Sequence, residues 1–112
     1  MTDEELVDAL KALAHPVRLR IMQALTGSER NVGEIDDAAD IGQPTLSQQL
    51  AVLRNAGLVK TRKDAKLVYY RVDEARMANV VGAASALGGL SGNAVRQSRQ
   101  PAPGVANFAK LG

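Results

Sequence analysis

The spacing of apolar residues along the chain predicts five helices and one β-hairpin. In five segments apolar residues recur every three or four positions, the period of a helix with one buried face, over about residues 3–14, 16–26, 32–40, 43–56 and 74–88. Residues 59–72 instead alternate and are rich in β-branched and aromatic residues, which predicts two strands joined by a turn at residues 64 and 65. Together these elements predict a mainly α fold with a two-stranded β-hairpin.

The residues between these segments end one helix and begin the next. Pro16 disfavours a helical conformation at His15 and suits the first turn of a new helix, so we expect His15 at a helix N-cap or junction. Gly27 and Gly57 stand where helices of these lengths end. Residues 41 and 42 make a tight turn into the fourth helix. Two helices joined by such a turn and followed by a hairpin are typical of a winged helix-turn-helix.

Charge divides the chain more sharply than its net value of +2 indicates. Residues 1–42 contain four Lys or Arg and nine Asp or Glu, whereas residues 43–72 contain six Lys or Arg and one Asp. A basic patch on a helix-turn-helix is typical of DNA binding, although any single lysine can be an ordinary solvated charge. In the acidic segment we expect Arg18 and Arg20 to make structural or surface ion pairs.

Composition excludes several kinds of site. Without cysteine there are no disulfides or thiolate sites, and one histidine cannot build an imidazole-rich metal site. Asp36, Asp37 and Asp40 lie close in sequence, but we interpret them as a solvated acidic face, and we predict no metal and no cofactor. No set of nucleophile and base indicates an enzyme. Apolar runs fall short of the roughly 18 residues of a membrane span and the acidic start is unlike a signal peptide, so we expect a cytoplasmic protein.

Polar, uncharged residues begin the fourth predicted helix, at the end that a helix-turn-helix presents to the major groove. Amide side chains can bind adenine through two hydrogen bonds, and hydroxyl groups can bind bases or phosphates. Alternatively, the hydroxyl groups satisfy free N–H groups of the first helical turn. We predict base reading by Gln43, Thr45, Ser47, Gln48 and Gln49.

Cationic residues of the hairpin and the preceding helix are expected to contact DNA phosphates. For Arg54 a carboxylate of the third helix is an equally good partner. Tyr69 and Tyr70 face opposite sides of a strand, so one of them should pack on the core. Ala65 replaces the glycine usual in a type I′ turn, which argues against that turn. The predicted backbone contacts are Arg54, Lys60, Arg62, Lys63 and Lys66.

Several motifs occur in an order found in one bacterial family: LAHP with RL at residues 13–19, QPTLSQQL at 43–50, LR at 53–54, AGLV at 56–59 and YY at 69–70. On these motifs the chain resembles the ArsR/SmtB family of winged-helix repressors over about residues 6–88. The run GQPTLSQQL and EAR at residues 74–76 are most similar to its persulfide-sensing, BigR-like branch. The resemblance implies a homodimer built from the first and fifth helices. It also implies that the dimer represses transcription from an imperfect palindrome until an inducer releases it.

The sensing residues of the family are absent from this chain. Metal-sensing members place cysteines where this chain has residues 31–33, or Asp, His and Glu at positions that here are Glu74, Arg76, Leu87 and Leu90. Persulfide sensors place cysteines at the positions of Gln23 and Gly89. The inducer is therefore unknown, and regulation through abundance alone is an open alternative.

The predicted assembly is a dimer on DNA. The core is aliphatic, with one Phe, two Tyr and no Trp, and a domain of this size often completes its burial by dimerising. We predict one winged helix-turn-helix domain over residues 1–90 and a flexible tail over residues 91–112. The predicted partner is double-stranded operator DNA, and a winged helix that docks on another protein is the alternative. Predicted dimer contacts are Leu6, Leu10, Leu13, Met77, Val80, Val81, Ala84 and Leu87.

Overall fold

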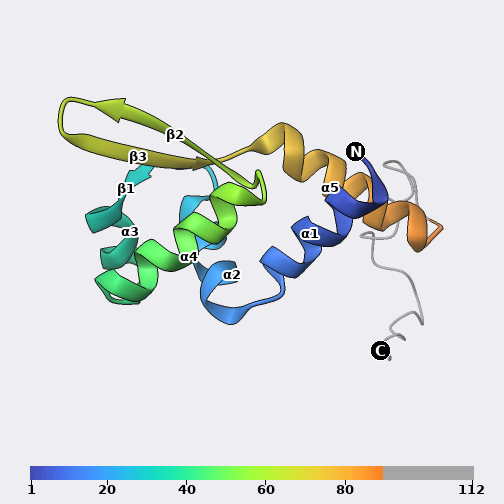
Figure 1. Ribbon diagram of the computed structural model, residues 1–112, viewed down its shortest axis with the longest axis horizontal. Helices are drawn as coiled ribbons and strands as arrows, with labels where there is room; N and C mark the ends of the chain where they lie inside the picture. Colours follow the sequence, from blue (N-terminus) through green and yellow to red (C-terminus); the bar gives the residue numbers. More distant parts are fainter. Residues whose placement is uncertain (90–112) are drawn as a thin grey trace, which may run out of the picture. The chain divides into compact units, whose positions relative to one another are not determined.

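A computed structural model describes residues 1–89 of the chain (Figure 1). Contacts divide the chain into a compact unit, Met1–Val80, and a second unit, Val81–Gly112. The tail predicted over residues 91–112 lies outside the described residues. The elements are α1 (Asp3–Leu13), α2 (Pro16–Leu25), β1 (Arg30–Asn31), α3 (Val32–Ala39), α4 (Gln43–Asn55), β2 (Val59–Asp64), β3 (Leu67–Val72) and α5 (Glu74–Leu87). The predicted mainly α fold with a hairpin is confirmed.

Side chains satisfy free N–H groups where four of the helices begin, and at α5 the Asp73 carboxylate accepts from the Arg76 N–H at 3.1 Å. The Thr2 hydroxyl accepts from the Glu5 N–H at 3.1 Å, and the Glu5 carboxylate accepts from the Thr2 N–H at 2.8 Å, which forms a capping box at α1. Asn31 and Glu34 form the same arrangement at α3. At α2 the Nδ1 atom of His15 accepts from the Val17 N–H at 3.2 Å, which confirms His15 as an N-cap.

A short third strand was not predicted. β1 pairs with β3 through Arg30 with Tyr70 and Asn31 with Tyr69, giving an antiparallel sheet of order β1-β3-β2. Two residues carry no alternation, and neither Arg nor Asn favours strands, so the pattern predicted a loop here. Pairing occurs because β3 offers an unpaired edge beside the start of α3.

The hairpin turn lies one residue later than predicted. Asp64 pairs with Leu67, so Ala65 and Lys66 form a two-residue loop. The φ angle is positive, at 57°, for Ala65 but not for Lys66. A type I′ turn needs a positive φ at both positions, so that turn is excluded, as the alanine indicated.

The end of α4 fixes the start of the hairpin. The N–H of Gly57, whose φ is 76°, donates to the Arg54 carbonyl at 3.0 Å, and the N–H of Leu58 donates to the Leu53 carbonyl at 3.0 Å. These two bonds form a Schellman motif, which requires a left-handed residue at Gly57. The Leu58 carbonyl in turn accepts from the Asp73 N–H at 2.9 Å, which ties the end of α4 to the residue before α5.

The core is aliphatic, as predicted, and it determines which face of α4 is buried. Leu46, Leu50 and Leu53 form the buried stripe of α4 that their spacing predicted. α1 contributes Ala9 and Ala12, small residues that let two helices approach closely, whereas its larger apolar residues lie partly or largely outside the core. The buried cluster consists of Ala9, Ala12, Ile21, Met22, Leu25, Ile35, Leu46, Leu50, Leu53, Leu58, Val59 and Val80.

Candidate nucleic-acid interface

The turn between α3 and α4 is held by side chains that bond the main chain. One Asp36 oxygen accepts from the N–H groups of Ile41 at 3.0 Å and Gly42 at 2.8 Å. Arg20 donates to the carbonyls of Ala39 at 3.1 Å and Asp40 at 3.4 Å. These bonds satisfy main-chain groups that the tight turn leaves without helical partners. They fix the angle at which α4 leaves α3, and they give Asp36 a structural role in place of the solvated one that we expected.

The first turns of α4 present polar side chains away from the core. Gln43, Thr45, Ser47 and Gln48 are all exposed. None of these side chains makes a hydrogen bond within residues 1–89, and α4 has no side-chain N-cap, so the hydroxyl groups do not serve the free N–H groups of the helix. Their hydrogen-bonding groups are therefore available to a ligand.

Two of the predicted DNA contacts, Gln49 and Arg54, differ in whether their side chains are already bonded within the chain. The Oε1 atom of Gln49 accepts from Nη1 of Arg18 at 2.7 Å, so this side chain is engaged inside the chain. Arg54 is exposed, and within the described part of the chain it makes no ion pair, so the alternative of an α3 carboxylate partner is wrong. Arg18 and Arg20 do not form the ion pairs that we predicted, because both donate to main-chain carbonyls instead.

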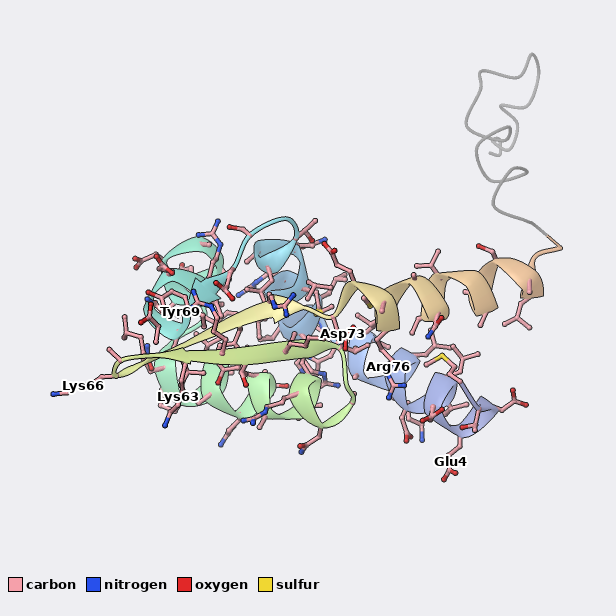
Figure 2. The ribbon with its side chains drawn as sticks, turned by 90° about the horizontal axis from the view of Figure 1, so that it is seen from above. Glu4, Lys63, Lys66, Tyr69, Asp73 and Arg76 are labelled. Atoms are coloured by element: carbon pink, nitrogen blue, oxygen red, sulfur yellow. The ribbon has the colours of Figure 1, made fainter. Side chains whose placement is uncertain are left out.

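The hairpin carries cations on both faces and at its tip. Lys60 pairs with Arg71, so two cations stand directly opposite each other, an arrangement that destabilises a sheet. Lys63 and Lys66 lie at the outer end of the hairpin (Figure 2). All four side chains are exposed, and none of them makes an ion pair within residues 1–89. They form a surface suited to phosphates.

Arg62 differs from these four cations because it is already paired. Its Nη2 atom lies 2.7 Å from Oε1 of Glu29, and its Nε atom lies 3.1 Å from both oxygens of that carboxylate. The guanidinium also lies 4.8 Å from the ring centre of Tyr69, which faces it across the hairpin, and 3.7 Å from Asp64. Hydrogen bonding from Arg62 lowers the pKa of Glu29, and the same bond raises the pKa of Arg62.

The two tyrosines of β3 are divided as the alternation predicted. Tyr69 shares a face with Arg62, whereas Tyr70 lies opposite Thr61 and packs against the core. The hairpin therefore has one face toward the core at its base and one toward solvent.

Sequence reasoning missed further exposed residues on the same surface. Ala51 and Val52 are exposed on α4, and each lies four residues after a predicted base-reading residue, Ser47 and Gln48 respectively. Residues four apart share a helix face, so counting forward from Gln48 would have found them. Arg71 is not among the predicted phosphate contacts, although alternation along the strands indicates that it shares a face with Lys60, as its register opposite Lys60 shows.

Apolar side chains are exposed on α1. Val7 is 47% exposed and Leu10 is 39% exposed, although both belong to the apolar stripe of this helix. Of the other predicted dimer contacts, Leu6, Leu13 and Met77 pack against the core of the chain itself, and Val80 is buried in it. In α5, Val81 and Leu87 are exposed. The apolar surface left for a partner is therefore smaller than the predicted set.

The described part of the chain shows no group of three or more side chains suited to a metal ion. Within that part there is also no helix long and apolar enough to cross a membrane.

The known proteins to which the chain is similar are bacterial regulatory proteins. A model described as "Bacterial regulatory protein, arsR family" matches residues 15–61. A biofilm growth-associated repressor of Xylella fastidiosa (strain Temecula1 / ATCC 700964) is 49% identical over 79 residues, which are 70% of this chain and 69% of the relative. One from Agrobacterium fabrum is 48% identical over 83 residues, 74% and 71% of the two chains. The crystal structure of the transcriptional repressor BigR from Xylella fastidiosa has a TM-score of 0.61 and 45% identity, covering 78% of this chain and 96% of that one.

Proposed function

The chain belongs to the arsR family of bacterial regulatory proteins and is a DNA-binding transcriptional regulator, and we propose that it binds an imperfect palindrome as a homodimer and represses the adjoining promoter. One observation carries the proposal. The exposed polar start of α4 and the exposed cations of the hairpin belong to the same compact unit, in which the end of α4 leads directly into β2. The repressor names of the relatives from Xylella fastidiosa and Agrobacterium fabrum support the sign of the regulation.

In the proposed complex α4 reads base edges in the major groove. Gln48 and Thr45 lie three residues apart on the exposed side of α4, away from the buried leucines. Gln43 and Ser47 lie in the same first turns. Amide groups suit adenine, and the Thr methyl suits the methyl group of thymine. Gln49 is left out of the base contacts because Arg18 already occupies its acceptor.

The hairpin and the end of α4 supply the proposed phosphate contacts. Lys60, Lys63, Lys66 and Arg54 are exposed and make no ion pair in the part of the chain that is described. Arg62 is left out because Glu29 already holds two of its nitrogens. Phosphate contacts position the protein without reading sequence, so these residues contribute affinity for every DNA.

The proposed homodimer uses the exposed apolar residues of α1, Val7 and Leu10. Two-fold symmetry would present two copies of α4 to successive major grooves, about 34 Å apart. Leu10→Glu places a charge in the proposed interface and is expected to shift the sedimentation coefficient from dimer to monomer. The same change at exposed Lys11, Lys11→Glu, is the matched control and should leave the dimer intact.

Selection of bound sequences from a random pool of double-stranded DNA tests the proposal. The chain should enrich an inverted repeat whose half-site centres lie about 10 base pairs apart. Gln48→Ala should relax the preference at one base pair, at a cost of about 1–3 kcal/mol. A reporter promoter that overlaps the selected sequence should lose output when the chain is present. Enrichment of no sequence would overturn the proposal and favour a winged helix that docks on protein.

A further inference from the structure

Arg18 connects three helices through its side chain. It belongs to the first turns of α2, and its Nε atom donates to the Ala12 carbonyl at 2.6 Å, while Nη2 donates to the Lys11 carbonyl at 3.3 Å. Both carbonyls belong to the last turn of α1, where main-chain oxygens have no helical partner and a positive charge is favourable. The remaining terminal nitrogen, Nη1, donates to Gln49 of α4 at 2.7 Å.

A guanidinium is suited to this role because it is planar. Its donors point in fixed directions, so bonds to two carbonyls of α1 also fix the direction of the third bond toward α4. A lysine offers one flexible ammonium group and could not hold both helices in a defined geometry. The arrangement therefore fixes the rotation of α4 relative to the end of α1.

Other contacts between α1 and α4 leave that rotation less restricted. The fully buried residues of α1 are Ala9 and Ala12, whose short side chains do not interlock deeply with a neighbour, while Leu6 and Leu13 pack against the core only in part. Beside Arg18 an open hollow of about 300 Å³ separates the two helices, lined by residues that include Asp8, Val52 and Asn55. Arg18, held by the carbonyls of α1, supplies a directional contact across this boundary through its bond to Gln49.

Gln49 directly follows Gln48, the central residue of the proposed reading surface. Successive residues are turned by about 100° around a helix, so Gln49 lies at the edge of the buried stripe while Gln48 points away from it. A small rotation of α4 would move the Gln48 amide out of register with a base edge, because bidentate contacts require a defined geometry. Anchoring Gln49 prevents such a rotation.

We propose that Arg18 and Gln49 are a positioning pair: through their hydrogen bond, α1 sets the rotation at which α4 presents Gln48 and Thr45 to DNA. The inference rests on the proposed function, because it assumes that α4 reads bases and that α1 contacts a second copy. It reassigns Gln49 from a base-reading residue to one that acts through its neighbour.

Gln49→Met is the main test, because methionine keeps the length and helix propensity of glutamine, changes no charge, and removes the acceptor. Affinity for the selected operator should fall about tenfold, the size expected when a hydrogen bond to a charged group is lost. Affinity for scrambled DNA and the salt dependence should stay unchanged. Gln48→Met is the matched control: it should relax preference at one base pair, whereas Gln49→Met should weaken the operator without changing which bases are preferred.

A double-mutant cycle tests the pairing itself. Arg18→Gln combined with Gln49→Met should bind the operator no more weakly than Arg18→Gln alone, because one bond is lost in each case. Without DNA, the NMR signal of the Arg18 Nε–H should be protected from exchange, and Gln49→Met should shift it. If Arg18→Gln does not fold, the Gln49→Met measurements decide the matter alone.

Different results would refute the two proposals. Additive losses in the cycle, or a changed base preference in Gln49→Met, would show that Gln49 reads DNA and would overturn the positioning role. Unchanged operator affinity in Gln49→Met would also overturn it. A wild-type chain that does not distinguish operator from scrambled DNA would instead overturn the proposed function.

Discussion

Two cations of the same hairpin, Lys66 and Arg62, are expected to respond differently to the same substitution. Lys66 is exposed in the loop at the tip, with no ion pair to any residue of the described chain. Arg62 gives Nε and Nη2 to Glu29 and stacks on Tyr69. Lys66→Gln and Arg62→Gln each remove one positive charge, so any long-range effect on DNA binding is similar for both.

The magnitude follows from counterion release. Each lost phosphate contact lowers the slope of log K against log salt by about 0.9, so a dimer that loses two contacts changes by about 1.8. Between about 50 and about 200 mM salt, the wild type should therefore lose about twelvefold more affinity than Lys66→Gln. Arg62→Gln should keep the slope of the wild type, because Arg62 contributes no phosphate contact in the proposed complex.

Fluorescence anisotropy with labelled operator at several salt concentrations measures both slopes. Arg62→Gln leaves the Glu29 carboxylate without its partner beside the DNA surface, so it should bind more weakly at every salt concentration. Adding Glu29→Gln restores local neutrality and should recover most of that affinity. Equal reductions of the slope in Lys66→Gln and Arg62→Gln would refute the reasoning. Such a result would mean that Arg62 breaks its ion pair with Glu29 on DNA and contacts a phosphate itself.

Three further predictions concern stability. Gly57→Ala should lower the free energy of unfolding by about 1–2 kcal/mol in urea, because φ is 76° there and an added Cβ would lie 2.9 Å from a guanidinium; an unchanged value would contradict the left-handed C-cap. Asp36→Ala should cost about 1–3 kcal/mol, because two N–H groups of the turn before α4 lose their acceptor, and a matched substitution at the exposed residue 37 should cost much less. The hydrogen-bonded ion pair with Arg62 lowers the pKa of Glu29 from its ordinary value of 4.5. The stability that Glu29 contributes is therefore present above pH 4.5 and is lost as the pH falls through the lower pKa of the folded state. Urea unfolding at several acidic pH values should show this loss in the wild type and not in Glu29→Gln.

Local pattern was sufficient for most of the fold. The leucines of α4 recur at helical spacing and are buried, and Pro16 and Gly57 mark helix ends through restrictions on their own backbone. Such signals act over a few residues, so they can be recognised without knowing what packs nearby. β1 could not be recognised in this way, because its two residues form a strand only through pairing with Tyr69 and Tyr70.

The candidate site was predictable in its location but not in its internal partners. The polar start of α4 and the cationic hairpin follow from composition and period. The partners of Gln49 and Arg62 lie 31 and 33 residues away along the chain, and no local pattern connects them. The sequence also did not show which face of α1 is buried. The helices pack closely, so the small residues Ala9 and Ala12 are buried while larger residues of the apolar stripe are exposed.

The bonding partners of the carboxylates explain why negative charge is concentrated in residues 1–42 and positive charge in residues 43–72. In the acidic segment, Glu5 and Glu34 complete capping boxes and Asp36 holds the turn before α4, so these groups serve nearby main-chain N–H groups. Glu29 alone forms an ion pair with the hairpin among the carboxylates of residues 1–42, and it reaches Arg62. The remaining cations of residues 43–72 make no ion pair within the described residues, so the folded chain keeps its positive potential around α4 and the hairpin. A surface with few internal counterions attracts a polyanion more strongly at low salt, which is why salt dependence is the most direct measure of this interface.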